Sequence, residues 1–320
     1  MKRKSFLFFL LPILALFLFL PTNAKALIVS YPTIELSAKP GETVSKQVRL
    51  ENEGDKEITF YSSIYNFKSN NKDGKPELIP LPQEGLVDLA SWIKVEKGPI
   101  TLAPKQSKDI DITIDVPSYA DPGGHYATVL WGDNSQKTDE KANLSINWKT
   151  GHLILLKVSG DVKEDVTISN FKVKKGYQNR LPIEFTTELQ NTGNVHIKPV
   201  GQIEIKNIFG GKSGIAQFNN TGGNILPKSS REFDDAWIGE KNVQDGGFFQ
   251  ELRNEFKNFA IGRYTANIAI FYGNDQKMLE AHDSFWVLPW RVMLVALILL
   301  LIIFFLIKKY NKMVIKRSKK

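Results

Sequence analysis

The chain has 320 residues, no cysteine and a formal net charge of +8 at pH 7. Without cysteine it can form no disulfide bond and cannot be a lipoprotein anchored through an N-terminal cysteine. Four of its 42 Lys and Arg residues precede residue 27, eight lie at Arg291 or beyond, and all 34 Asp and Glu residues lie between. The 30 basic residues left in this middle part give it a net charge of −4. We therefore predict no nucleic-acid partner.

Residues 1–26 have the three parts of a secretory signal peptide. Residues 2–4 are basic, Phe6–Leu20 is apolar, and Ala24 and Ala26 supply the small residues of a cleavage site. An uncleaved N-terminal anchor is the alternative. Both interpretations predict that the middle part of the chain is exported.

Residues 27–160 are predicted to form an immunoglobulin-like β-sandwich. The clearest of several short alternating segments is 108–117, in which Ile110, Ile112 and Ile114 share one face and aspartates occupy the other. A period of two is typical of a half-buried antiparallel strand. Many such strands, separated by turn residues, are typical of β-sandwiches.

Residues 161–288 are predicted to form a second immunoglobulin-like β-sandwich, because they repeat the order of features in the first. Asn52–Asp55 and Asn191–Asn194 each close a strand, and turns at Pro104 and Pro227 follow them. A chance match among common turn residues is the alternative. The fold class predicted for the whole chain is all-β, with two tandem sandwiches followed by one C-terminal transmembrane helix.

A tyrosine follows a glycine at the start of one strand in each predicted domain. Tyr126 follows Gly124 and His125, and Tyr264 follows Gly262 and a basic residue. Immunoglobulin-like sandwiches commonly place a tyrosine near the start of the penultimate strand, where it stabilises a corner. We predict that both tyrosines are structural. A ligand-binding loop is the less favoured alternative, since His125 has no partner at a metal-like spacing.

The other face of the Tyr126 strand is unusually apolar. It carries His125, Val129 and Trp131, and the next strand adds Trp148. We favour burial of these side chains against the connection 66–93 or the second domain. The alternative is a binding face, since an apolar patch with a polar rim marks a partner site.

The sequence contains no recognisable catalytic motif. Its four histidines stand outside any GxSxG or HExxH frame, and it has no P-loop and no GxGxxG sequence that opens a helix. We therefore predict a protein that is not an enzyme, with no catalytic residue, no cofactor and no metal site.

A short helix is predicted near residues 248–259, inserted in the second sandwich. Its apolar residues recur at steps of three and four and form one stripe: Phe249, Leu252, Phe256 and Phe259. We favour packing of this stripe onto its own sandwich. Docking of a partner and contact with the membrane are the alternatives.

Residues 289–308 are predicted to span a membrane. Val292–Ile307 is an unbroken apolar run, Trp286 and Trp290 occupy interfacial positions, and the tail 309–320 is basic without an acidic residue. With its flanking residues the run reaches the thickness of a bilayer core. By the positive-inside rule, the tail is cytoplasmic and the body is extracytoplasmic.

Four segments in residues 35–130 resemble a known family. They are LSAKPGETVSKQVRLENEGDKEITF, FKSNNKDGK, ITLAPKQSKDIDITIDVP and PGGHYATVLWG. In this order they are similar to the peptidoglycan-binding domain of the WxL-protein-interacting surface proteins of Gram-positive bacteria, whose layout the whole chain also shares. The resemblance implies a surface adaptor that contacts cell-wall glycan and holds a partner protein. Residues 161–288 are more similar to generic bacterial adhesion-type sandwiches.

These observations predict a membrane-anchored, extracytoplasmic, non-catalytic binding or adaptor protein at the cell membrane. Its expected partners are cell-wall glycan or another surface protein, together with the lipid bilayer around its C-terminal helix. The alternative is a structural accessory subunit of an envelope membrane complex.

Overall fold

The computed structural model describes residues 27–69, 72–79, 88–132, 149–239 and 246–318. The predicted signal peptide at 1–26 lies outside these residues. The chain forms two compact units that divide between Gly160 and Asp161, except that Lys68–Glu77 groups with the second unit. Each unit encloses its own hydrophobic core.

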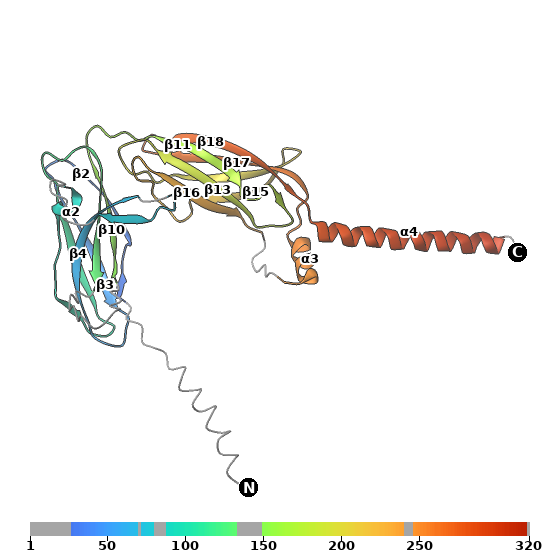
Figure 1. The fold of residues 1–320 in the computed structure, drawn as a ribbon, viewed down its shortest axis with the longest axis horizontal. Helices are drawn as coiled ribbons and strands as arrows, with labels where there is room; N and C mark the ends of the chain where they lie inside the picture. Colours follow the sequence, from blue (N-terminus) through green and yellow to red (C-terminus); the bar gives the residue numbers. More distant parts are fainter. Residues whose placement is uncertain (1–26, 70–71, 80–87, 133–148, 240–245, 319–320) are drawn as a thin grey trace, which may run out of the picture. The chain divides into compact units, whose positions relative to one another are not determined.

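The first unit is a sandwich of two sheets (Figure 1). One sheet has the order β1 (Leu27–Val29), β3 (Thr43–Asn52), β8 (Ser107–Asp115) and β6 (Ile93–Lys94). The other has the order β2 (Thr33–Ala38), β10 (Lys149–Val158), β9 (Gly123–Gly132), β4 (Ile58–Ser69) and β5 (Pro76–Ile79), and β7 (Ile100–Leu102) also pairs with β4. β9 and β10 are antiparallel, whereas β2 runs parallel to β10.

The alternating pattern of β8 shows how this core forms. Ile110, Ile112 and Ile114 are at most 4% exposed. On the opposite, solvated face, Asp109 accepts two hydrogen bonds from the guanidinium group of Arg49 on β3, at 2.7 and 2.9 Å. The strand predicted from the period of two is confirmed.

The second unit is also a sandwich of two sheets. The first sheet has the order β11 (Val166–Val173), β13 (Ile183–Asn191) and β16 (Ser230–Trp237). The second has the order β12 (Tyr177–Gln178), β18 (Lys277–Val287), β17 (Gly262–Tyr272), β14 (Val200–Asn207) and β15 (Lys212–Phe218). β17 and β18 are antiparallel, and β12 runs parallel to β18.

The two units share one plan. In each, the last two strands pair antiparallel, and the last strand also pairs with a short early strand in parallel. This arrangement is of the immunoglobulin type. The predicted fold class, two tandem sandwiches followed by a C-terminal helix, is confirmed.

Two buried asparagines show that the sequence repeat is also a structural repeat. Asn52 and Asn191 are both fully buried. Nδ2 of Asn52 donates to the carbonyl of Leu102 at 3.1 Å, and Nδ2 of Asn191 donates to the carbonyl of Ile225 at 3.0 Å. Each acceptor lies two residues before the proline of the turn that follows. The lysine after that proline has a φ of 61° in the first unit and 56° in the second.

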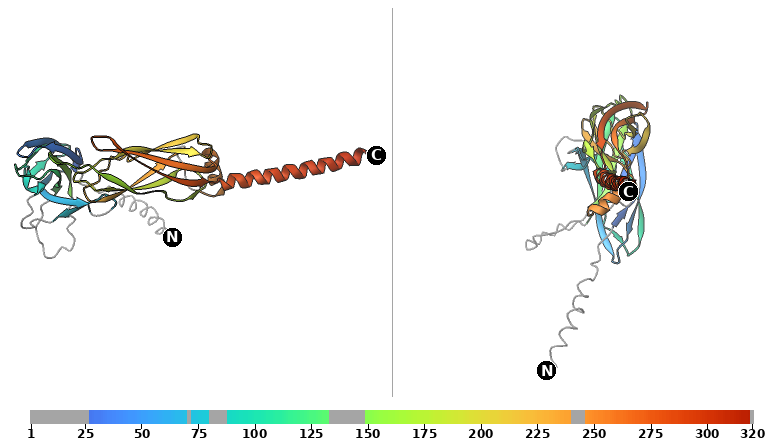
Figure 2. Two further views of the ribbon diagram at one scale, coloured as in Figure 1. Left: turned by 90° about the horizontal axis from the view of Figure 1, so that it is seen from above. Right: turned by 90° about the vertical axis from the view of Figure 1, so that its right-hand side faces the viewer.

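Within the described residues, three helices accompany the sheets: α2 (Leu89–Trp92), α3 (Phe248–Lys257) and α4 (Trp290–Ser318). α4 continues without a break from the predicted span at 289–308 into the predicted tail at 309–320, so the boundary at residue 308 is one of composition only. Its segment Trp290–Ile315 is long and apolar enough to cross a membrane, and no part of that segment is buried. The left view in Figure 2 shows α4 extending beyond the second sandwich.

Candidate functional site

Val129 and Trp131 lie in the core of the first unit rather than on a binding face. Both side chains are fully buried. The ring of Trp131 meets Phe60 edge to face, with ring centroids 6.1 Å apart. The binding-face interpretation is therefore wrong for these two residues, because their face of β9 packs into the hydrophobic core of the first unit. Trp148 lies outside the described residues.

His125 is held by neighbours of its own unit. Its Nδ1 lies 2.9 Å from Oδ1 of Asp88, and its Nε2 lies 2.9 Å from the carbonyl oxygen of Asp121. The ring also packs on Trp92, with centroids 4.7 Å apart. Burial opposes the charged form of both side chains, but the hydrogen bond between them raises the pKa of His125 and lowers the pKa of Asp88. Asp88 also accepts from the N–H of Leu89, so His125 fastens α2 to β9.

Tyr126 and Tyr264 lie near the start of the last strand but one in their units. Tyr264 is 8% exposed, and its ring contacts Trp237 and Phe285 at centroid distances of 5.9 and 5.8 Å. Tyr126 is half-buried and contacts Phe67 at 5.9 Å. Both rings pack within their own sandwich, as expected of structural tyrosines.

One end of the second unit gathers several strand ends around the start of α4. In register, the first residue of β17 faces the last residue of β18, and the third residue of β17 faces the last residue of β14. In the other sheet, the first residue of β13 faces the last residue of β16. α4 follows β18 directly, and Figure 1 shows α3 beside the first turns of α4. This end of the sandwich is the candidate functional site.

Two arginines and two glutamates hold this end together, and we name them the arginine–glutamate network. Arg180 binds Glu251 of α3 through two nitrogens, at 3.1 and 3.4 Å. Nη1 of Arg291 on α4 donates to Glu255 of α3 at 2.7 Å and lies 3.9 Å from Glu251. The Glu255 side chain is fully buried, and those of the other three members are at most 17% exposed. The two pairs of opposite charges balance each other.

Glu255 also caps the first turn of α4. Its Oε2 accepts hydrogen bonds from the backbone N–H groups of Arg291 and Val292, at 2.9 and 3.2 Å. The first N–H groups of a helix have no partner within the helix, and a negative charge there is favoured by the helix dipole. One carboxylate of α3 therefore fixes both the position and the start of α4.

The apolar stripe of α3 points away from the sandwich, so the favoured prediction of internal packing is wrong. Phe249 and Phe256 are 81% and 73% exposed, whereas Glu251, Asn254 and Glu255 are buried. The helix takes this orientation because its glutamates bind arginines at the sandwich and on α4, and a buried carboxylate without such partners would be strongly destabilising. The spacing of the two glutamates was a usable signal in the sequence. Their partners, 71 and 36 residues away, could not be inferred from it.

Large apolar side chains are exposed around this end of the second unit. They come from α3 and from the neighbouring strand ends and loops. We name them the apolar collar: Tyr177, Ile208, Phe209, Ile238, Phe248, Phe249, Phe256, Phe259, Ile261, Trp286 and Trp290. Aromatic residues beside an apolar helix are typical of a membrane–water interface. The collar therefore marks a surface that fits a membrane boundary.

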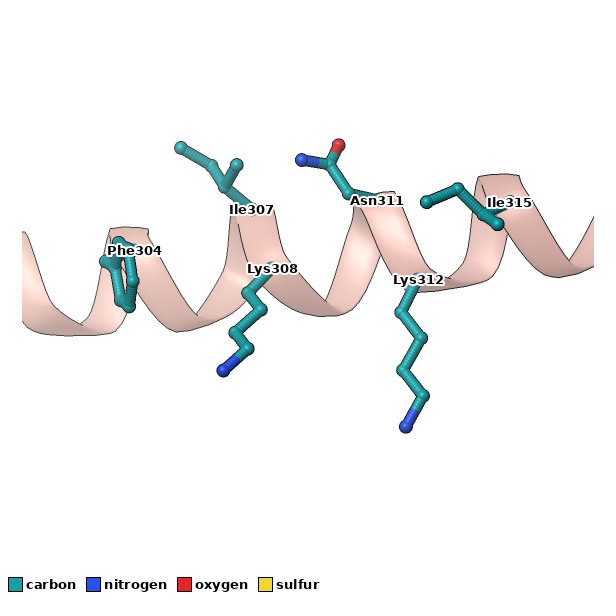
Figure 3. A pocket seen from close by; sticks show the side chains of 6 residues that line it. All are labelled: Phe304, Ile307, Lys308, Asn311, Lys312 and Ile315. Atoms are coloured by element: carbon teal, nitrogen blue, oxygen red, sulfur yellow. The ribbon is translucent and has the colours of Figure 1, made fainter.

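The far part of α4 changes from apolar to basic. Figure 3 shows Lys308 and Lys312 one turn apart on the same side of the helix, with Phe304, Ile307 and Ile315 along it. The hollow between these side chains is lined by α4 alone, so it is a feature of one helix surface and not a pocket between elements. The basic part begins at Lys308. The helix between Arg291 and Lys308 is therefore about as long as a bilayer core is thick.

The chain has no relative among known proteins that identifies its family. No protein-family model matches the chain, and no curated protein is significantly similar to it in sequence. Among solved structures, the class 5 fimbriae chaperone CfaA is 14% identical, over 82% of this chain and 100% of that one, with a TM-score of 0.39. The YadV chaperone is 10% identical, over 81% and 99%, with a TM-score of 0.35, and the E. coli chaperone DraB is 11% identical, over 82% and 98%, with a TM-score of 0.34. These are distant likenesses, and it is the strand pairing within each unit that identifies the immunoglobulin-type fold.

Within the described parts of the chain, no three His, Asp or Glu side chains lie close enough together to hold a metal ion.

Proposed function

We propose that this chain is a single-pass membrane protein that holds two immunoglobulin-like domains on the outer face of the cell membrane and binds a partner there without catalysis. The observation that supports it most is α4, whose segment Trp290–Ile315 is long and apolar enough to cross a membrane and has no part buried. Its unbroken apolar run, Val292–Ile307, reaches the thickness of a bilayer core with its flanking residues, and so much exposed apolar surface would be unfavourable in water.

The charge distribution supports an orientation with the body outside. Beyond the apolar part of α4, Lys308, Lys309 and Lys312 begin a tail that contains no acidic residue. Basic residues are retained on the cytoplasmic side of a membrane. The sandwiches, on the other side of α4, are then extracytoplasmic, which agrees with the predicted signal peptide at residues 1–26.

Peptidoglycan, or a protein at the cell surface, is the proposed partner of the sandwiches. The similarity of residues 35–130 to a peptidoglycan-binding domain favours cell-wall glycan. For a protein partner, β11 and β15 offer a physical route, since each lies at the edge of its sheet. Edge strands carry backbone groups to which a further strand can pair.

Co-sedimentation tests this function. Full-length protein in lipid nanodiscs would be mixed with purified peptidoglycan sacculi and centrifuged, with empty nanodiscs as the control. We expect the protein to pellet with the sacculi. Protein that stays in the supernatant would contradict glycan binding. Its recovery from native membranes in a stoichiometric complex would instead favour the accessory-subunit function.

A further inference from the structure

We infer that α3 is a membrane-interface helix, whose Phe249 and Phe256 side chains insert among the acyl chains of the outer leaflet beside α4. This inference rests on the proposed membrane anchorage of α4. It extends that anchorage by giving the second sandwich a further contact with lipid.

The direction in which α3 faces is fixed by buried charges. Glu251 and Glu255 point toward the arginine–glutamate network, so the opposite face of the helix must point outward. That face carries Phe249 and Phe256, which are 81% and 73% exposed. Rotation of the helix to bury these rings would remove both glutamates from their arginines.

The apolar surface of α3 is continuous with that of α4. A single groove is lined by Phe249, Leu252 and Phe256 from α3 and by Val292, Val295 and Leu299 from α4. Leu299 lies nine residues after Trp290, which corresponds to about 13 Å along the helix. If α4 spans the bilayer from Arg291 to Lys308, the α4 side of this groove lies within the hydrocarbon. Lipid acyl chains then occupy this groove.

The exposed charges of α3 fit a lipid surface. Both glutamates are buried, and the exposed charged side chains in Phe248–Lys257 are Arg253 and Lys257. An interfacial helix typically combines aromatic residues with lysines or arginines that meet anionic headgroups. Arg253 also lines the groove, where its long side chain can place the guanidinium group at headgroup level.

Fluorescence quenching by labelled lipids tests this inference in the full-length protein. Single cysteines would replace Phe249, Phe256, Leu299 or Asp275 and carry an environment-sensitive dye, which is feasible because the chain has no cysteine. The protein would be reconstituted in vesicles of phosphatidylcholine and phosphatidylglycerol that contain nitroxide-labelled acyl chains. Leu299→Cys reports on α4. Asp275→Cys reports on the β17–β18 turn, at the opposite end of the sandwich.

We expect dyes at Phe249→Cys and Phe256→Cys to be quenched by the lipid nitroxides nearly as strongly as the dye at Leu299→Cys, and the dye at Asp275→Cys to be unaffected. Quenching at Leu299→Cys alone would overturn the inference and leave the proposed anchorage intact. Dyes at α3 that are shielded from aqueous iodide but not quenched by lipid would indicate a second copy of the chain, and would also overturn it. Absence of quenching at Leu299→Cys would overturn both proposals.

Discussion

At the scale of single residues, buried amide side chains connect distant turns in each sandwich. Besides the bond to Ile225, Nδ2 of Asn191 donates to the carbonyl of Val195 at 2.8 Å, and its Oδ1 accepts from the N–H of Gly193 at 2.9 Å. One side chain thus satisfies three backbone groups in a region without solvent. Asn52 has the equivalent bonds in the first unit.

Replacing this asparagine should therefore be costly. We expect Asn191→Ala to lower the free energy of unfolding of the second sandwich by about 2–3 kcal/mol, because buried backbone groups lose their partners. Asn274→Ala, at an exposed turn, should change it by less than about 0.5 kcal/mol. Urea unfolding followed by tryptophan fluorescence compares the two variants. Equal stability of both would contradict the structural role of Asn191.

Asp235 should make the second sandwich less stable as pH rises. Burial, partly offset by a hydrogen bond from the N–H of Asn219 at 3.1 Å, raises the pKa of Asp235 to about 6. Its Oδ2 is buried and has no partner among the described residues. The folded state therefore binds the proton more tightly than the unfolded state. This contribution to stability is complete below about pH 4 and is lost as pH rises through about 6.

Asp235→Asn should remove this loss. Because the side chain is partly exposed, we expect the variant to gain only about 1–2 kcal/mol relative to the wild type between pH 4.5 and pH 7.5. Urea unfolding at the two pH values measures the gain, with Asp275→Asn as an exposed control. A difference between variant and wild type that does not change with pH would contradict the role of Asp235.

At the scale of elements, α3 shows what the sequence could and could not predict. Its periodicity placed a helix near 248–259, and the structure has one at Phe248–Lys257. Periodicity identifies an apolar face but cannot tell a protein core from a lipid phase, because both favour the same side chains. Arg180 and Arg291 determine which face of α3 is buried, and their contacts with the helix depend on the tertiary fold.

The first sandwich shows a similar limit at β9. Alternation separated two faces of this strand, but both contain apolar residues, so the pattern alone did not reveal which face was covered. Burial of Trp131 depends on Phe60 of β4, a strand that is distant in sequence. By contrast, β8 alternates isoleucine with aspartate, and its buried face followed directly from the sequence.

Removal of Glu255 should release α3 from α4. The substitution Glu255→Ala would leave Arg291 buried without its carboxylate and the first turn of α4 without its cap, a loss of about 3–5 kcal/mol for a buried pair. We expect hydrogen–deuterium exchange in residues 246–258 to rise, while β13 and β17 stay protected. Glu280→Ala, at an exposed position of β18, serves as the control. Unchanged exchange in α3 would show that the arginine–glutamate network does not hold the helix.

At the scale of the whole molecule, the sequence predicted the order of the domains but not which surface residues come together. The apolar run after Arg291 and the basic residues beyond it were sufficient to predict the C-terminal helix, and the repeated turns were sufficient to predict two sandwiches. The gathering of the apolar collar at one end was not predictable, because Tyr177, Ile208 and Ile238 are brought there by three separate strands. Only strand register places them together.

The most direct test of the proposed function is the sidedness of the two ends of α4 in intact cells. A membrane-impermeant maleimide would be applied to full-length variants that carry one cysteine, Asp275→Cys in the sandwich or Lys312→Cys in the basic part of the helix. We predict labelling of Asp275→Cys in intact cells and labelling of Lys312→Cys only after the membrane is permeabilised. Labelling of both positions from outside, or of Lys312→Cys alone, would contradict a body held outside the membrane by α4.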